Sequence, residues 1–320
     1  MQTFDRLVTV FGGSGFVGRH IVRALARRGF RIRVAVRRPD LAGHLQPLGA
    51  VGQINFVQAN LRFPDSVRAA VEGAEIVINC VGILHETGRQ KFDSVQASGA
   101  EAVARAAADA GAKLIHISAI GANATSTSAY ARTKAEGEAA VLREVPGAVI
   151  LRPSVIFGPE DTFLNRFAGM AQALPVLPLV GGGETRFQPV FVGDVAQAVM
   201  AAVDGKVKPG TVLELGGPAV KSFREVLDFV LETTGRKRLL LPLSFGLARF
   251  QAKFLQLLPN PLLTEDQVEL LKSDNVVSEA ATSEGRTLEA LGIHPQSLEA
   301  VAPTWLWRFR KQGQFAEQVR

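Results

Sequence analysis

The feature that most constrains this chain is a glycine-rich segment near its N-terminus. The residues from Leu7 to Arg28 read LVTVFGGSGFVGRHIVRALARR, which is a short apolar run, a glycine-rich turn with G-x-x-G-x-x-G spacing and a helical pattern. Glycines let the backbone turn tightly and approach a pyrophosphate, and the positive end of the following helix faces the phosphates. The flanking strand and helix favour this reading over an ordinary turn. The predicted dinucleotide-binding residues of this segment are Gly12, Gly13, Ser14, Gly15, Phe16, Val17 and Gly18.

Short apolar segments then alternate with helical patterns along the first half of the chain. Strands are predicted at residues 31–36, 55–58, 75–79, 113–117 and 148–151, and helices at residues 65–71, 95–110 and 130–142. This alternation predicts an α/β protein with a doubly wound parallel sheet, the Rossmann arrangement, in which a cofactor lies at the carboxyl ends of the strands.

The second half of the chain is less regular, because prolines and glycines interrupt it between residues 175 and 183. A strand is predicted near residues 211–215 and a helix at residues 223–232. We expect a dinucleotide-binding Rossmann domain at residues 1–160 and a smaller C-terminal α/β lobe with docking helices at residues 161–320. Strands are free to cross this boundary.

Composition excludes several classes of protein. Cys80 is the single cysteine, which excludes an intramolecular disulfide and fits a reducing compartment, and the five histidines lack metal-ligand spacing, so we predict no metal. No apolar run reaches the roughly 18 to 20 residues that cross a bilayer. The first strand begins at residue 7, which leaves no room for a signal or transit peptide. We expect a protein on the cytoplasmic side, soluble or peripherally attached to a membrane.

The net charge of +6 predicts an anionic partner, but no nucleic-acid-binding module accompanies it, so we expect no nucleic acid. Cations gather at residues 236–258 and 304–315, where we expect contact with an anionic membrane surface.

Between residues 245 and 258, apolar side chains at helical spacing lie beside Arg249 and Lys253. Such a helix rests at a membrane surface or in a partner's groove, and the alternative is a core helix with solvated basic residues. The apolar positions are Phe245, Ala248, Phe250, Phe254, Leu255, Leu257 and Leu258. The terminal Trp305, Trp307 and Phe309 either anchor an interface or dock back on the chain.

The end of the second strand indicates which dinucleotide is bound. NAD-binding proteins commonly carry an acid there for the ribose 2′-hydroxyl, whereas this chain has Arg37 and Arg38, which suit a 2′-phosphate. NADP(H) is therefore the predicted cofactor, and a solvated basic loop is the alternative. Asn60, followed by Leu61, is placed to meet the adenine edge after the third strand. The backbone of residues 80–82, which are Cys80, Val81 and Gly82, follows the fourth strand and passes close under the cofactor.

A second chemical signature is the Y-x-x-x-K pair of Tyr130 and Lys134. Residues four apart share one face of a helix, so the ammonium lowers the phenol's pKa and reaches the nicotinamide ribose. Active reductases of this type also need a hydroxyl just after the fifth strand. Here Ser118 is followed by Ala119 and Ile120, so we expect Ser118 to lie under the cofactor, with Tyr130 and Lys134 holding it and their catalytic role vestigial.

These motifs resemble the short-chain dehydrogenase/reductase superfamily in its extended or atypical form, over roughly residues 5–200. The resemblance rests on FGGSGFVG, NCVG, HISA, YARTK, RPSVIFGPED and RFQPVFVGDVAQAV. It adds the residues after the sixth strand, Pro153, Ser154 and Val155, to the cofactor-binding set.

Residues 152–170 and 261–278, with the ETG at residues 86–88, resemble the dinucleotide-binding accessory subunits of respiratory complex I and their bacterial counterparts. This resemblance implies a structural NADP(H), a place at the junction of the peripheral and membrane arms, other subunits of that complex as partners, and no part in electron transport itself. It places the protein at the cytoplasmic face of a bacterial inner membrane. An active reductase or epimerase that uses Tyr130 and Lys134, and a regulator that senses the NADPH/NADP⁺ ratio, stay open as alternatives.

Overall fold

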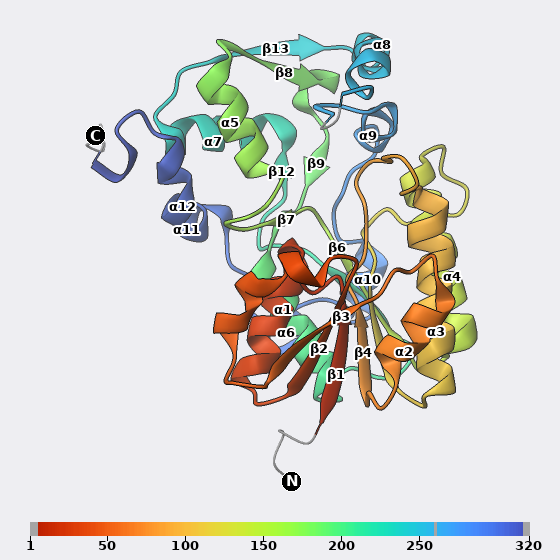
Figure 1. Cartoon of the computed structure of the whole chain (residues 1–320). Helices are drawn as coiled ribbons and strands as arrows, with labels where there is room; N and C mark the ends of the chain where they lie inside the picture. The colour runs from red at the N-terminus through yellow and green to blue at the C-terminus, as the bar shows by residue number, and fades with distance from the viewer. Residues whose placement is uncertain (1–5, 259–260, 316–320) are drawn as a thin grey trace. The chain divides into compact units, whose positions relative to one another are not determined.

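A seven-stranded parallel sheet with the order β11-β6-β5-β4-β1-β2-β3 organises the first part of the computed structural model, which describes residues 6–258 and 261–315 (Figure 1). The strands are β1 (Leu7–Phe11), β2 (Arg31–Val36), β3 (Ile54–Gln58), β4 (Ile76–Asn79), β5 (Lys113–Ile117), β6 (Val149–Pro153) and β11 (Val212–Leu215). The strand order reverses between β1 and β4, the place where open α/β sheets bind ligands. The predicted fold class is confirmed.

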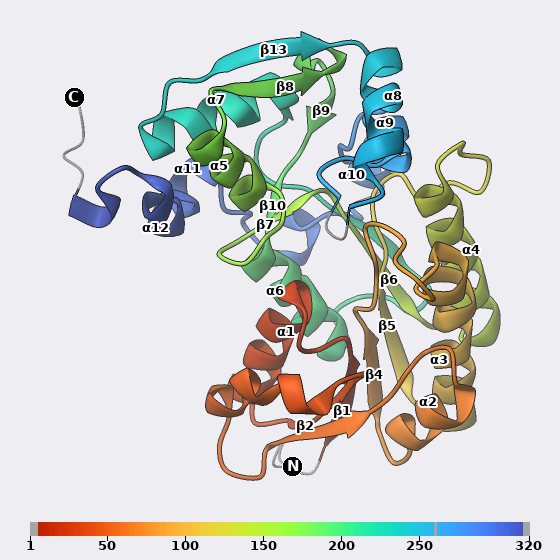
Figure 2. The ribbon, with the colours of Figure 1, turned by 45° about the horizontal axis from the view of Figure 1, so that its top comes forward.

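Helices cover both faces of this sheet (Figure 2). One face carries α1 (Phe16–Arg27) and α6 (Val192–Val203), and the other carries α2 (Pro64–Val71), α3 (Ser98–Asp109) and α4 (Ala129–Glu144). On the second face an apolar cluster joins the three helices to the sheet. The shorter turns are η2 (Pro39–Leu41), η3 (Gly43–Leu48), the π-helical η4 (Asp93–Ala97), α10 (Glu279–Ser283) and η6 (Glu289–Leu291).

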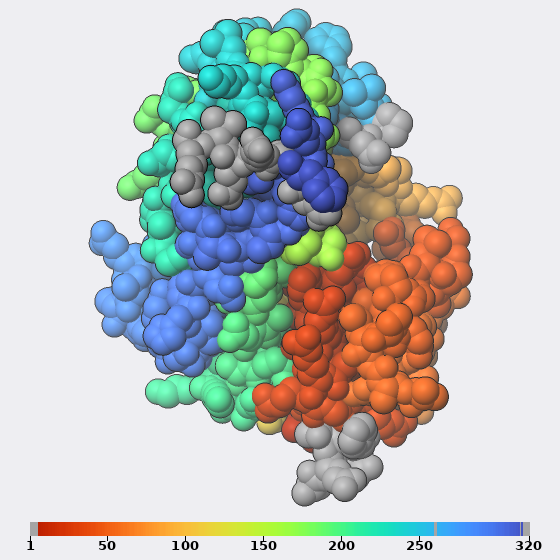
Figure 3. Space-filling model, turned by 90° about the vertical axis from the view of Figure 1, so that its left-hand side faces the viewer, coloured from red at the N-terminus to blue at the C-terminus, as the bar shows by residue number. Residues whose placement is uncertain are grey.

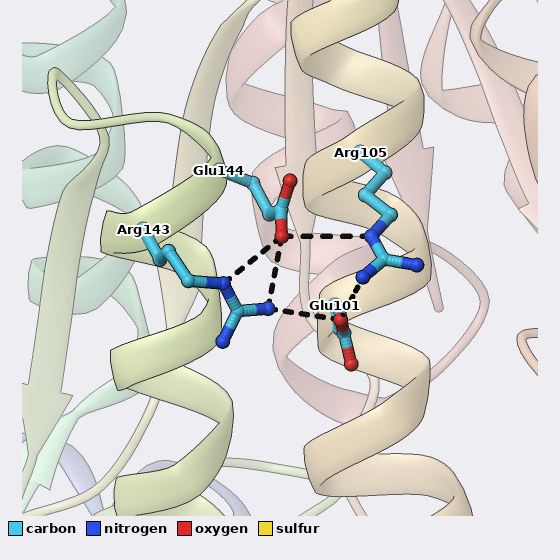
Figure 4. Close-up of polar contacts among 4 residues, drawn as sticks. All are labelled: Glu101, Arg105, Arg143 and Glu144. Atoms are coloured by element: carbon cyan, nitrogen blue, oxygen red, sulfur yellow. Dashed lines mark hydrogen bonds and ion pairs between the residues drawn. The ribbon is translucent and has the colours of Figure 1, made fainter.

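Charged side chains bridge α3 and α4 on the outside of this layer (Figure 4). The Arg143 guanidinium lies 2.8 Å from carboxylate oxygens of both Glu101 and Glu144, and Arg105 pairs with the same two carboxylates. The arginines are more than half exposed, so each pair contributes at most about 1 kcal/mol. The apolar cluster beneath therefore holds the two helices together, and the ion pairs align them.

Residues far apart in the sequence complete the first unit. Contacts divide the chain into Met1–Pro153, Gly193–Leu215 and Glu279–Ile293 on one side, and Ser154–Val192, Gly216–Ser278 and His294–Arg320 on the other. Strand β11 was expected in the second half, yet it pairs with β6 in the large sheet.

Figure 3 shows N-terminal residues, in red and orange, beside green residues near position 200, where Arg28 pairs with Asp204 at 2.9 Å. The outer ends of the two expected domains, residues 1–5 and 316–320, lie outside the described residues.

The second unit is built from short paired strands and helices. The strand pairs are β7 (Ile156–Phe157) with β10 (Val190–Phe191), β8 (Val176–Val180) with β13 (Leu239–Leu243), and β9 (Arg186–Phe187) with β12 (Lys221–Ser222). Its helices and turns are α5 (Leu164–Ala173), η5 (Gly181–Gly183), α7 (Phe223–Thr234), α8 (Phe245–Leu255), α9 (Glu265–Leu270), α11 (Leu298–Val301), α12 (Pro303–Leu306), η7 (Trp307–Phe309) and η8 (Gly313–Phe315). A capping box of Ser222 and Glu225 begins α7, and Gly235 with a φ of 63° ends it. Aromatic rings dominate this core, where Phe157 packs against Phe191 and Trp305.

Candidate dinucleotide-binding site

The glycine-rich loop joins β1 to α1 and has no room for side chains. Gly12 has a φ of 74°, and a Cβ on Gly18 would lie 2.3 Å from the Gly12 carbonyl oxygen. No side chain caps the N-terminus of α1, and its first turn has no acid, so its positive end is available to an anion. Ser14, Phe16 and Val17 are half-buried around this turn, and Gly13 packs against β2. The loop is therefore shaped as a phosphate cradle requires.

Two exposed arginines, Arg37 and Arg38, leave the carboxyl end of β2. The Arg38 guanidinium lies 2.7 Å from the Asp40 carboxylate, and this contact raises the pKa of Arg38 and lowers the pKa of Asp40. Arg37 makes no hydrogen bond or ion pair with any described residue. One of the two predicted 2′-phosphate ligands is thus already paired with an acid.

At the carboxyl end of β3, Asn60 is used by its own turn. Its Oδ1 accepts a hydrogen bond from the Arg62 backbone N–H at 3.2 Å, and its backbone N–H donates to Ser66 Oγ at 3.0 Å. The following Leu61 is 8% exposed and packs in the apolar cluster under α3. The backbone here is held firmly at the edge of the sheet.

After β4, the backbone passes directly under the glycine-rich loop. A Cβ on Gly12 would lie 3.1 Å from Val81 Cγ2 and 3.3 Å from the Cys80 carbonyl carbon. Asn79 Oδ1 accepts a hydrogen bond from the Val81 N–H at 3.1 Å and so fixes this approach. Burial raises the pKa of the Cys80 thiol to about 12, with Lys134 opposing the shift, so the thiol stays protonated.

Lys134 is the buried cation of this region. Its Nζ donates to the Ile117 carbonyl oxygen at 3.1 Å and lies 3.4 Å from where a Cβ of Gly82 would be. Burial lowers the pKa of Lys134 to about 8, against the attraction of Glu138. Tyr130 lies one turn earlier on α4, half-buried, with its ring edge-to-face to Phe92 at 5.9 Å.

The hydroxyl groups near Tyr130 serve other purposes. Ser118, one residue beyond β5, is 4% exposed, and its Oγ has no hydrogen-bond partner among the described residues. Ser128 caps α4 by accepting from the Ala131 N–H at 3.2 Å, and Ser126 accepts from the Ser128 N–H at 3.1 Å. The loop before α4 thus uses these two serines to hold its own backbone.

The predicted residues after β6 divide between the two units. Pro153 ends β6 and accepts from the Ile120 N–H at 2.9 Å. Ser154 and Val155 belong to the second unit, where Ser154 Oγ and the Val155 N–H donate to Asn275 Oδ1 at 2.7 and 2.9 Å. Sequence reasoning missed Asn275, because nothing local marks a residue whose partners lie 121 positions away.

Helix α8 presents two faces. Ala248 and Ala252 are fully buried and Phe245 packs beside them, whereas Phe250 and Phe254 are 60% and 61% exposed. Leu257 and Leu258 are exposed as well. At the C-terminal end, Trp305 is buried in the core of the second unit and Trp307 is partly exposed, so Trp305 docks back on the chain.

Within residues 6–258 and 261–315, no group of three or more His, Cys, Asp or Glu side chains is arranged to hold a metal ion. In the same ranges, no helix is long and apolar enough to cross a bilayer.

Comparison with known proteins gives relatives along the whole chain. A family model described as the NAD dependent epimerase/dehydratase family matches residues 8–216. NADH dehydrogenase (ubiquinone) 1 alpha subcomplex subunit 9, mitochondrial, is 34% identical in Arabidopsis thaliana, covering 96% of this chain and 79% of that protein. In Mus musculus the same subunit is 35% identical, covering 98% and 83%. Among solved structures, DesIV, a dTDP-glucose 4,6-dehydratase of Streptomyces venezuelae with NAD and TYD bound, has a TM-score of 0.71 at 18% identity and covers 98% of this chain and 100% of that one, which shows the fold alone.

Proposed function

Because the chain belongs to the NAD dependent epimerase/dehydratase family, and within it to the alpha subcomplex subunit 9 proteins, we propose that it is an accessory subunit of respiratory complex I that holds NADP(H) and stabilises the assembly. The observation that carries the proposal is the extent of the similarity. The family model ends at residue 216, whereas the identity with subunit 9 covers 96% of the chain and so includes most of its C-terminal third.

The geometry of the first unit supports a tightly held dinucleotide. The glycine-rich loop, the uncapped N-terminus of α1 and the backbone at residues 80–82 form a surface without intervening side chains. Arg37 and Arg38 support NADP(H) over NAD(H), since guanidinium groups pair with phosphate. In this role the nucleotide is a structural ligand, and its hydride chemistry is not used.

The surroundings of Tyr130 support holding rather than turnover. A reductase needs a second hydroxyl donor to stabilise charge on the substrate oxygen, and losing such a donor commonly costs about 10²-fold or more in rate. Ser118 Oγ is buried at the end of β5, and Ser128 is committed to capping α4. Lys134 is positioned by the Ile117 carbonyl to meet a ribose hydroxyl.

The exposed apolar face of α8 supports a peripheral position on the membrane arm, at the cytoplasmic face of a bacterial inner membrane. Phe250, Phe254 and Leu257 project from a helix that carries Arg249 and Lys253 and no acid. Aromatic and basic groups on one helix suit an anionic lipid surface.

The test is isolation of complex I from native membranes by mild solubilisation, followed by native electrophoresis and mass spectrometry of its subunits. We expect this chain to migrate with the complex and NADP(H) to be released from it on denaturation. A chain that migrates alone while the complex is complete would refute the subunit assignment, and release of NAD(H) only would refute the cofactor assignment.

A further inference from the structure

The end of β2 offers less positive charge to a 2′-phosphate than its two arginines suggest. Asp40 lies within 2.7 Å of Arg38 and cancels its charge, and an acid at this place also repels phosphate. Only Arg37 remains uncommitted among the described residues of this turn. A dianionic phosphate ester usually meets more than one cation, so the neighbouring strand end is the place to look for a second.

The turns after β2 and β3 leave the sheet side by side. Val36 is paired with Gln58, and the Ala59 N–H donates to the Val36 carbonyl oxygen at 2.9 Å. Adjacent strands lie about 4.8 Å apart, so the residues that follow them share one edge. The turn after β3 is rigid, because the Asn60 carbonyl accepts from the Phe63 N–H at 2.8 Å and Asn60 Oδ1 accepts from the Arg62 N–H at 3.2 Å.

Arg62 is a cation without an anion. Its guanidinium carbon lies 5.7 Å from the centre of the Phe63 ring, and its Nε is buried with no hydrogen-bond partner. The acid nearest in sequence, Asp65, pairs with Arg68. Burying part of an unpaired guanidinium costs free energy that a bound anion would offset. The Phe63 ring, 59% exposed, holds the guanidinium plane in place at the surface.

We propose that Arg62 is a second binding residue for the phosphate on the adenosine ribose and, with Arg37, sets the preference for NADP(H) over NAD(H). The proposal rests on the NADP(H) assignment above. The ligand chemistry is a phosphate monoester dianion, which a planar guanidinium binds through two parallel N–H groups.

The test compares Arg62→Gln with Arg68→Gln, a matched control on the first helix after the same turn. The first measurement is the ratio of NADP(H) to NAD(H) released on denaturing the full chain as purified. The second is binding of 2′,5′-ADP, which carries the phosphate without the nicotinamide. We expect Arg62→Gln to lower both the ratio and the 2′,5′-ADP affinity about tenfold or more. We expect Arg68→Gln to change them by less than about twofold.

Arg62→Lys keeps the charge but loses the planar fork, so we expect a preference between those of the wild type and Arg62→Gln. An unchanged ratio in a folded Arg62→Gln protein would overturn the proposal, and so would an equal loss of NADP(H) and NAD(H), which would assign Arg62 to the turn alone. A wild-type chain that releases mainly NAD(H) would instead refute the cofactor assignment on which the proposal rests.

Discussion

At the scale of the residue, His116 and Asn79 connect the core of the sheet to the candidate site. They are cross-strand neighbours in β4 and β5, and Asn79 Nδ2 lies 3.2 Å from His116 Nδ1. Since Asn79 Oδ1 already accepts from the Val81 N–H, its amide group donates to the imidazole, which is therefore neutral with its proton on Nε2. His116 thus orients the amide that holds the backbone under the glycine-rich loop.

This arrangement predicts how stability depends on pH. Burial, and secondarily the charge of Lys134, lowers the pKa of His116 to about 3 from an ordinary 6.5. Between those values the unfolded chain binds more protons than the folded one, so stability falls as the pH falls, by about 1.4 kcal/mol per pH unit. We expect His116→Gln to remove this part of the slope in urea unfolding between pH 6.5 and 4.5.

The matched control is the exposed His44→Gln, which should keep the wild-type slope. Identical slopes for His116→Gln and the wild type would contradict the assignment. Lys134 acts in a separate window, because its pKa of about 8 lies below 10.5, so its contribution makes stability rise with pH only between those values.

At the scale of the element, α8 combines a core helix with a surface helix. Two alanines face the interior, and Phe250 and Phe254, which contact each other edge-to-face at 5.4 Å, face outward. Sequence analysis left both descriptions open, and burial separates them by face. An exposed aromatic pair on a basic helix is more apolar surface than a free helix usually presents.

We expect Phe250→Ser with Phe254→Ser to weaken sedimentation with phosphatidylcholine vesicles that contain phosphatidylglycerol. Burying each phenylalanine contributes about 1.5 to 3 kcal/mol, so the double variant should lose about 100-fold or more in partitioning. The control is Leu84→Ser, which removes an exposed leucine of the first unit. Unchanged partitioning of the double variant would show that this face meets protein rather than lipid.

At the scale of the whole molecule, a structural nucleotide should behave as part of the fold. A ligand that binds only the folded chain at about 100 times its Kd adds about 2.7 kcal/mol to the free energy of unfolding. We expect NADP⁺ to raise the melting temperature of the nucleotide-depleted chain and NAD⁺, at equal concentration, to raise it less. The measurement is differential scanning calorimetry, with Arg37→Gln as the variant that should narrow the difference. Equal shifts with both nucleotides in the wild type would count against the 2′-phosphate site.

The predicted elements of the first unit agree closely with the structure because their signals are local. Strands β2 and β5 have the predicted bounds, and α4 begins at Ala129 where a helix from Tyr130 was predicted. The strand near residues 211–215 also exists, but its place beside β6 was not predicted. Strand pairing depends on which residues meet in space, and those of β11 and β6 are separated by most of one unit.

The sequence by itself determined the glycine-rich turn, the alternation of strands and helices, and the spacing of Tyr130 and Lys134, since each resides in contiguous residues. Only the tertiary structure decided which polar groups meet. His116 reaches Asn79 across 37 positions, and Asn275 reaches Ser154 across 121. Burial and pairing are properties of neighbours in space, so the charge that is left for a ligand became visible only in the folded chain.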